Sequence, residues 1–386
     1  MATPQLSPGV LVREVDLTVG RADNVLDNIG AIAGPFEIGP IDEPIEITSE
    51  QGLINTFGKP ISTDAQYEYW MSASSYLSYG GVLKVCRTDG TTLNNANAGV
   101  GIAATTTLKI KNYDDYLNDY SEDNTFTYAS KDPGTWGNGL KVCQIDNFAD
   151  QTISLGSTDP FLAGAEVGFG ITTTLSGVVV PGAGTTSEFS GYLKGIITGV
   201  TTNTTTNGTI EVKIVSRVDS SGETAIEYAE GTNTNAFGAS QTLNFVNNSG
   251  INTTGTGIGA TSSAVTDWYD AQTLGLTNST TYWKSIAPKP TSTNYVTSRS
   301  GKNDEMHVVV VDDDGTLTGV KGNILEKHLG LSKALDAVSD VNSPQRNYYK
   351  QFLADYSSHV YAGYNISQAA DAKWGTTPTS TGFSSG

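Results

Sequence analysis

The chain has few of the side chains that carry out most enzyme chemistry. Its 386 residues include two cysteines and three histidines, and no histidine has a cysteine or a second histidine at metal-ligand spacing. His328 and His359 are expected on an amphipathic segment and at the start of a strand. Acidic residues are numerous, but none stands out as one of a catalytic pair. These features predict a protein that is not an enzyme, with no catalytic, metal-binding or cofactor-binding residues.

Basic residues are scarce and never clustered. Lys and Arg number 22 against 40 Asp and Glu, which gives a formal net charge of −18. Nucleic-acid binders usually carry a basic patch, and an acidic surface repels both DNA and anionic lipid. We therefore expect no nucleic-acid partner and no direct membrane insertion.

Long apolar runs are missing as well. No run approaches the ~20 residues of a membrane span, and residues 1–10 contain neither the basic region nor the apolar core of a signal peptide. The chain is therefore expected to be made in a cytoplasm and to stay soluble. In that compartment Cys86 and Cys143, which each end the phrase LKVC, are expected to be buried reduced thiols.

Three motifs invite a chemical interpretation, and each has a simpler structural one. The Asp312–Gly315 run does not fit the ligand spacing of an EF-hand loop, so a solvated turn between two strands is expected. The glycines of residues 255–260 lie in an Asn- and Thr-rich tract instead of between a strand and a helix, which argues against a dinucleotide-binding loop. His307 lies within an apolar run and is expected on a strand face in the core.

The chain begins with an apolar segment at residues 8–19, PGVLVREVDLTV, which we call the arm. Its composition is strand-like, but no hairpin turn and no partner strand precede it. A single β-strand can neither satisfy its backbone hydrogen bonds nor bury its side chains. The arm must therefore pair far along the chain or with another molecule, which points to assembly.

Strand and helix signals follow the arm. A Gly-Pro-rich hairpin is expected at residues 31–40, and a strand with one wet face at 45–47. Thr48 and Gln51 match a capping box, which predicts a short helix that ends before Gly58.

A second helix is expected to start at Ser62 or Thr63 and to end at Gly80-Gly81. Its apolar positions recur at helical spacing, at Ala65, Tyr69, Trp70, Ala73 and Leu77. A buried strand, GVLKVC, then ends beside Arg87.

The composition changes between about residue 91 and residue 280, where Thr, Asn, Gly and Ser dominate. Helical periodicity is nearly absent there, and short alternating stretches predict strands at 108–113, 208–218 and 241–246. We interpret this region as one or two antiparallel β domains with long polar loops, on the outside of whatever the protein builds.

The core pattern returns near residue 300. Residues 305–320 predict a buried strand, an acidic turn and a second strand. Ser343-Pro344 opens a predicted helix with Tyr348, Tyr349 and Tyr356 on one side, and residues 359–365 predict another strand.

The predicted fold class is α+β and multidomain: a mixed α/β core domain, interrupted by inserted antiparallel β domains and preceded by an extended N-terminal strand arm. The predicted boundaries are 1–20 for the arm, 21–95 for the first part of the core, 96–284 for the insertion and 285–386 for the second part with a flexible tail.

Several phrases, taken in order, resemble the contractile tail sheath protein of myovirus-type bacteriophages. The resemblance covers about residues 5–90, 128–146 and, more loosely, 300–365. The phrases are SPGVLVREVD, AIAGPFEIGP, INTFGKP, YLSYGGVLKVCR and KDPGTWGNGLKV.

The resemblance implies that particular residues serve structure and assembly. In the arm, these are the subunit-contact residues Val10, Leu11, Val12, Val15 and Leu17. The motif residues are Gly34, Pro35, Gly39, Phe57, Gly58, Gly80, Gly81, Arg87, Pro133, Gly134, Trp136, Gly137 and Asn138. Trp136 is expected to cover the core and Asn138 to bond backbone. Three roles remain open for Arg87: it fixes a core carboxylate, it reaches a neighbouring subunit, or it is a plain surface charge.

Members of the family are structural, so the resemblance implies hexameric rings of this chain stacked helically around a tail tube. The implied partners are other copies of the chain, the tail tube protein, and the baseplate and tail terminator proteins. The implied location is the virion tail, assembled in the host cytoplasm, and contraction drives the tube through the host envelope.

Sheath proteins of this group usually continue well past the equivalent of residue 386, through a body that faces the tube. We therefore assign no tube-contacting residues. One alternative is a β-rich tail fibre or adhesin that binds host glycans, although fibres normally show a sequence repeat. Another is a secreted glycosidase, which would need a signal peptide.

Overall fold

The computed structural model describes residues 28–99, 106–122, 125–156, 168, 170–179, 188–203, 208–219, 222–225, 228, 236–246, 258–339, 344–363 and 379–386. The chain divides into two compact units. Among the described residues, the N-terminal unit comprises 28–36 and 44–88, and the large unit comprises 37–43 and everything from residue 89 onward.

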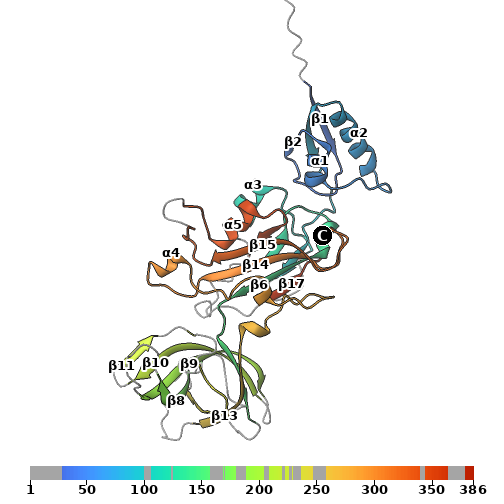
Figure 1. Cartoon of the computed structure of the whole chain (residues 1–386). Helices are drawn as coiled ribbons and strands as arrows, with labels where there is room; N and C mark the ends of the chain where they lie inside the picture. Colours follow the sequence, from blue (N-terminus) through green and yellow to red (C-terminus); the bar gives the residue numbers. More distant parts are fainter. Residues whose placement is uncertain are drawn as a thin grey trace, which may run out of the picture. The chain divides into compact units, whose positions relative to one another are not determined.

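The N-terminal unit is a three-stranded sheet with two helices (Figure 1). Its elements in chain order are β1 (Ile29–Gly34), β2 (Pro44–Ile47), α1 (Glu50–Phe57), α2 (Gln66–Ser78) and β3 (Val82–Arg87). The strand order is β1-β3-β2, with β1 parallel and β2 antiparallel to β3.

The hairpin expected at residues 31–40 is wrong, because β1 and β2 do not pair with each other. The two helices return the chain to the sheet, where β3 lies between β1 and β2. This strand takes the central place because Leu83 and Val85 alternate as buried residues against the helices. The remaining core side chains of this unit are Phe36, Ile47, Leu53, Phe57, Trp70, Ala73 and Leu77.

The predicted helix starts are also corrected. The α1 cap is Ser49, whose hydroxyl accepts a 3.1 Å hydrogen bond from the amide of Gly52, and Thr48 precedes it as a linker. Helix α2 begins at Gln66 without a side-chain cap, since its N-cap residue is Ala65. The buried side-chain amide of Gln66 holds the preceding loop: its oxygen accepts from Ile61 N and its nitrogen donates to Lys59 O. The predicted end of α1 is confirmed: Gly58 has a φ of 83°.

The large unit contains a four-stranded sheet, called here the core sheet, in the order β15-β14-β6-β17 (Figure 1). A three-stranded sheet has the order β16-β5-β4. The strands are β4 (Asn97–Gly99), β5 (Phe126–Ser130), β6 (Leu140–Asp146), β14 (Glu305–Asp312), β15 (Asn323–Ser332), β16 (Val360–Ala362) and β17 (Thr379–Gly382).

The helical elements of the large unit are short. They are α3 (Tyr113–Asp115), the π-helix η1 (Tyr116–Tyr120), η2 (Thr135–Gly139), η4 (Tyr269–Ala271), η5 (Trp283–Ser285), α4 (Asn294–Thr297) and α5 (Tyr349–Tyr356).

Several predicted elements of this unit shift. The strand expected at residues 108–113 is wrong: Leu108 and Ile110 are buried in an irregular segment, and Asn112 caps α3. The strand after the acidic turn begins at Asn323, because residues 313–322 form the turn region. The helix after Pro344 begins at Tyr349.

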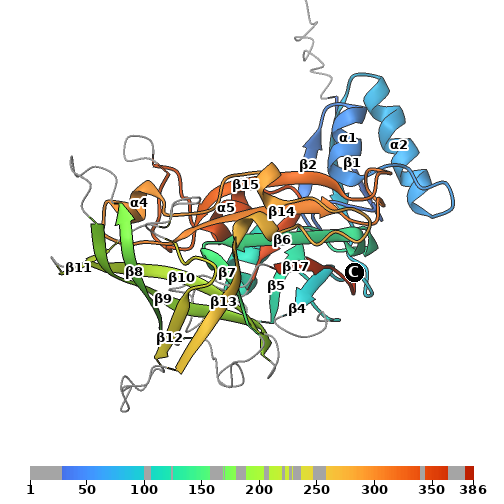
Figure 2. The same ribbon diagram turned by 60° about the horizontal axis from the view of Figure 1, so that its bottom comes forward.

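Between β6 and β14, residues 151–267 contain the strands of a sheet that closes on itself, called here the closed sheet. Every pairing in it is antiparallel, and β10 pairs with β9 to complete the ring β10-β7-β13-β12-β8-β9, with β11 beside β10 (Figure 2). The strands are β7 (Gln151–Leu155), β8 (Gly170–Val179), β9 (Glu188–Asn203), β10 (Gly208–Asp219), β11 (Gly222–Ala225), β12 (Thr242–Val246) and β13 (Ile258–Asp267).

A mixed, β-rich fold with several sheets is thus confirmed, including the predicted strands near 208–218 and 241–246. The expectation that residues 21–90 and 285–365 form one body stays a prediction. Strand β14 pairs with β6, whereas β1 and β2 pair with β3. Strands β6 and β14 are buried on both faces, which suits neighbours inside one sheet. The predicted domain boundaries stay a prediction.

Candidate functional site

His307 is a buried structural histidine, as predicted. The amide of Gly330 donates to its Nδ1 at 3.0 Å, so Nε2 carries the proton and lies 3.0 Å from the carbonyl oxygen of Pro288. Both ring nitrogens are therefore used to hold β14 to its neighbours.

His328 and His359 meet at one carboxylate, which the sequence did not indicate. His328 Nε2 lies 2.8 Å from Oε2 of Glu326, and His359 Nδ1 lies 2.6 Å from Oε1. The hydroxyl of Ser357 and the amide of Ser358 donate to the same carboxylate, each at 2.7 Å. We call Glu326, His328 and His359 the histidine–carboxylate cluster.

Burial alone would raise the pKa of Glu326, but the hydrogen bonds from His328, His359 and Ser357 outweigh it and hold the pKa well below its usual range. The cluster ties β15 to the segment between α5 and β16. Within the described part of the chain, no group of three or more His, Cys, Asp or Glu side chains is arranged to hold a metal ion.

The acidic turn after β14 is held by its first carboxylate. Asp312 is fully buried and accepts hydrogen bonds from the amides of Gly315, Leu317 and Thr318. The expectation that solvent satisfies these carboxylates is wrong for Asp312, since the turn folds its own amides around it. Asp313 pairs with Lys141 at 2.6 Å.

A buried polar network lies where the closed sheet joins the core sheet. We call it the junction network: Asp146, Asn147, Asp150, Lys213, Lys289 and Lys333. Lys333 pairs with Asp146 at 3.0 Å, and Lys289 pairs with Asp150 at 2.6 Å.

Lys213 reaches this network from the closed sheet. Its Nζ donates to the carbonyl oxygen of Asn147 at 2.8 Å and to Oδ1 of the same residue at 2.6 Å. Burial lowers the pKa of Lys213 to about 8. Phe148 and Trp268 pack beside the network with ring centroids 5.8 Å apart. The hydrogen bonds of Lys213 thus join the closed sheet to the segment that follows β6, and the Phe148–Trp268 contact packs beside them.

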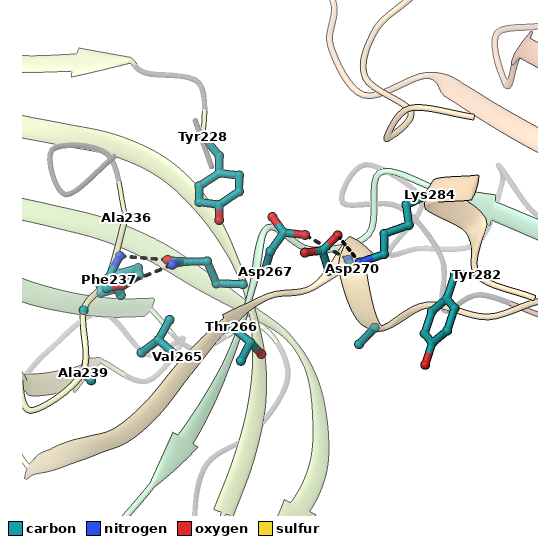
Figure 3. A pocket seen from close by; sticks show the side chains of 13 residues that line it. Tyr228, Ala236, Phe237, Ala239, Val265, Thr266, Asp267, Asp270, Tyr282 and Lys284 are labelled. Carbon is teal, nitrogen blue, oxygen red and sulfur yellow. Dashed lines mark hydrogen bonds and ion pairs between the residues drawn. The ribbon is translucent and has the colours of Figure 1, made fainter. Parts of the chain in front are cut away.

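An open cleft of about 960 Å³ lies beside β13 (Figure 3). Several of its polar side chains bind one another or backbone: Lys284 pairs with Asp270 at 3.1 Å, and the Gln151 amide bonds both the amide and the carbonyl oxygen of Phe237. Tyr228 and Tyr282 also line the cleft. These hydrogen bonds and this ion pair hold the walls of the cleft together, and they do not indicate a reaction.

The sheet edges differ in how available they are. Strand β15 carries two register shifts against β14, and its end is bonded by Asn347, whose carbonyl oxygen accepts from Ser332 N at 2.9 Å. Strand β17 is flanked by Leu274 and Gly275, which accept from the hydroxyl of Ser380. The edge of β15 is therefore interrupted, and the carbonyl groups of Leu274 and Gly275 lie beside β17.

The motif residues of the N-terminal unit lie at turns and in its core. Gly58 and Gly80 follow the two helices with positive φ angles. A Cβ at Gly34 would lie 2.7 Å from Cδ1 of Tyr69, and one at Gly81 would lie 2.6 Å from Cε1 of Tyr76. The same unit holds Pro35, at the end of β1, and the fully buried Phe57.

Arg87 is 1% exposed, and its Nε donates to the carbonyl oxygen of Phe36 at 2.6 Å. It is therefore a core residue, and the surface-charge interpretation is wrong.

The second group of motif residues lies in the large unit. Trp136 and Gly137 are buried, and Trp136 packs in the core formed with β6 and β14. Asn138 Oδ1 accepts a 2.9 Å hydrogen bond from the backbone amide of Gly386, which fits its predicted role.

The amide of Gly39 donates to Asp132 at 3.1 Å, beside Pro133 and Gly134. The structure thus brings Gly39 to the 133–138 loop.

The arm residues Val10, Leu11, Val12, Val15 and Leu17 lie outside the described residues. Cys86 is half-buried and Cys143 is buried; both are reduced. A search of the described residues for a helix long and apolar enough to span a membrane found none.

Three tail sheath proteins are similar to this chain. That of Salmonella phage ViI is 24% identical over 371 residues, covering 94% of this chain and 50% of that protein. That of Enterobacteria phage T4 is 33% identical over 143 residues, 36% of this chain and 20% of that protein. That of Vibrio phage KVP40 is 37% identical over 94 residues, 24% of this chain and 13% of that protein.

The resemblance to tail sheath proteins is thereby confirmed. The chain spans half the length of the first of these relatives and a fifth or less of the other two. No protein-family model matches it.

Proposed function

We propose that this chain, similar to three tail sheath proteins, is a structural subunit of a phage contractile tail sheath. The observation that carries the proposal is the match to the sheath protein of phage ViI along 94% of the chain. The architecture is compatible with it, since the buried polar clusters hold strands and loops together. The notion of a glycan-binding fibre has no comparable support.

In the proposed assembly, copies of the chain form hexameric rings that stack helically around a tail tube in the virion. The baseplate and tail terminator proteins lie at the two ends of the stack, and contraction drives the tube through the host envelope. Assembly in the host cytoplasm belongs to the same proposal. The subunit acts mechanically and needs no cofactor.

The arm is the proposed link between subunits. Ordering its ~12 residues costs roughly 12–24 kcal/mol of backbone entropy. Burying five apolar side chains returns about 2 kcal/mol each. Some six to ten hydrogen bonds add about 1 kcal/mol each. These terms nearly cancel, so one arm binds weakly, and many arms held near their sites bind together.

Electron microscopy of the purified chain tests the proposal. We expect hollow rings or tubes from the full chain, and monomers from a variant that lacks residues 1–20. Circular dichroism checks that this variant is folded. A full chain that stays monomeric at every concentration contradicts the proposed self-assembly, and normal polymers from the deletion contradict the role of the arm.

A further inference from the structure

The side chain of Lys213 meets an amide group inside the junction network. Its Nζ lies 2.6 Å from Oδ1 of Asn147 and 2.8 Å from the backbone carbonyl oxygen of the same residue. The other two lysines of the network pair with carboxylates. Lys213 is therefore the lysine of this network whose side-chain partner is an uncharged amide.

The contact is shielded from water, which favours reaction at the amine. Lys213 is 5% exposed and Asn147 is 7% exposed, and the buried rings of Phe148 and Trp268 pack beside them. Burial lowers the pKa of Lys213 to about 8. About one amine in ten is then neutral at pH 7, and a neutral, desolvated lysine is a nucleophile.

The amide of Asn147 is oriented by a second partner. Its Nδ2 donates to Oδ1 of Asn303 at 2.8 Å. Because a lysine ammonium group can only donate, Oδ1 of Asn147 faces Lys213 while Nδ2 faces Asn303. Asn303 is half-buried, so the amide nitrogen is directed toward a residue that is partly open to solvent.

Backbone hydrogen bonds hold the two residues in register. Asp150 N donates to the carbonyl oxygen of Val212 at 2.8 Å, and Oδ2 of Asp150 accepts from Ile214 N at 2.8 Å. Both neighbours of Lys213 are thus bound to the segment that contains Asn147. Two reacting groups held in place in this way need little further ordering to react.

We infer that Lys213 and Asn147 become joined by a side-chain amide bond within the chain. The neutral amine attacks Cγ of Asn147, so a bond forms between Nζ and Cγ while the carbonyl π electrons move onto Oδ1. When the carbonyl re-forms, the bond between Cγ and Nδ2 breaks. The departing nitrogen takes the bonding pair and one proton that Nζ gives up. The products are a Lys–Asn isopeptide bond and one molecule of ammonia.

The bond closes a long loop in the closed sheet. The two residues are 66 positions apart, and the loop between them contains β7, β8 and β9. Such a link restricts the unfolded chain as a disulfide does, but thiols cannot reduce it. Cys86 and Cys143 are both reduced and supply no disulfide of this kind. The inference goes beyond the proposed function and does not depend on it.

Mass spectrometry of the folded full chain tests the inference. We expect an intact mass lower than the sequence mass by one molecule of ammonia. Trypsin does not cleave beside a modified lysine, so the digest should contain residues 142–194 joined to residues 195–217. Fragmentation of this branched peptide should locate the bond between Asn147 and Lys213.

A matched pair of variants shows whether the lysine is required. Lys213→Arg keeps the positive charge, but the guanidinium group stays protonated and cannot attack, so this variant should have its full sequence mass. Lys284→Arg changes an exposed lysine and should still lose one ammonia. Circular dichroism checks that both variants are folded.

The unmodified chain decides the inference even where the Lys213→Arg variant fails to fold. A full sequence mass after prolonged incubation of the folded chain near pH 8 shows that the contact stays non-covalent and overturns the inference. Loss of ammonia at another place, such as a succinimide at an Asn-Gly step, also overturns it, as does a loss that persists in Lys213→Arg. None of these results requires polymers, so failure of the proposed function is a separate outcome.

Discussion

The N-terminal unit and the closed sheet solve the edge problem of β structure in opposite ways. In the closed sheet, β10 pairs with β9, so the ring has no long strand without partners on both sides. In the N-terminal unit, β1 pairs with β3 alone among the described strands, and Ile29 is exposed. The strands of the closed sheet therefore pair in a ring, whereas the sheet of the N-terminal unit ends at β1 within the described residues.

The two regions also differ in how buried polarity is used. Among the described residues of the N-terminal unit, Arg87 is the one charged side chain that is buried, and the core is otherwise mostly apolar. The large unit buries Asp146, Lys213 and Lys333 where its two main sheets meet. From the closed sheet, Lys213 and the amide of Ile214 donate hydrogen bonds into the junction network, at Asn147 and Asp150.

The strongest test of the comparison is to unfold one region without the other. Phe57→Ala removes a fully buried ring from the N-terminal unit and should cost that unit about 3–5 kcal/mol. Because small domains have little stability to spare, hydrogen exchange should then report lost protection in β1–β3 while β6 and β14 stay protected.

The matched control is Phe245→Ala in the core of the closed sheet. It should lower protection there and leave β1–β3 unchanged. Loss of protection in both regions from either variant would show that they unfold as one, and the comparison would fail.

The junction network sharpens the contrast in polarity. Lys333→Met removes the ammonium group that pairs with the buried Asp146 carboxylate, which should destabilise the large unit by about 3–5 kcal/mol. Urea unfolding measures the change. The control Lys284→Met breaks an exposed pair with Asp270 and should cost about 0–1 kcal/mol. Equal costs for the two variants would remove any special role for the buried pair.

The histidine–carboxylate cluster predicts a pH dependence. The folded-state pKa of Glu326 lies below its unfolded value, so its ionised form stabilises the fold above the unfolded pKa of about 4.3, and this contribution fades as the pH falls below it. Glu326→Gln should therefore cost about 1.5–3 kcal/mol near neutral pH and progressively less in acid. A difference from the unmodified chain that stays constant down to pH 3 contradicts this assignment.

The smallest effect concerns the start of α1. Ser49→Ala removes the observed cap and should cost the N-terminal unit about 1 kcal/mol. Thr48→Ala, at the position that the sequence motif favoured, should change stability by less than about 0.5 kcal/mol. Thermal unfolding of both variants decides between the two positions, and the reverse order of effects would restore the predicted capping box.

The elements that the sequence predicted well have strong local signals. The end of α1 was predictable because a glycine with positive φ stops a helix within the chain's own backbone. The strands near Val308 and Ile210 were predictable because an apolar period of two, or a continuous apolar run, reports strand burial directly. The core position of Trp136 agrees with what the family resemblance implied.

The elements that it predicted badly depend on distant partners. Residues 108–113 alternate like a strand, but Asn112 caps a helix and the segment packs without a ladder partner. No sequence pattern near Glu326 predicts that His359, far along the chain, will form a hydrogen bond with its carboxylate. A buried polar contact of Lys213 could have been predicted, because a lysine among the apolar residues of β10 needs a buried partner.

The amino-acid sequence alone determined that the chain is acidic, poor in catalytic side chains, rich in strands and similar to tail sheath proteins, because composition and local periodicity are properties of neighbouring residues. Only the tertiary structure decided that β3 separates β1 from β2, that one sheet closes on itself and that β1 pairs with β3 alone among the described strands. Strand order and closure depend on which distant backbones meet, and no local pattern in the chain encodes that choice.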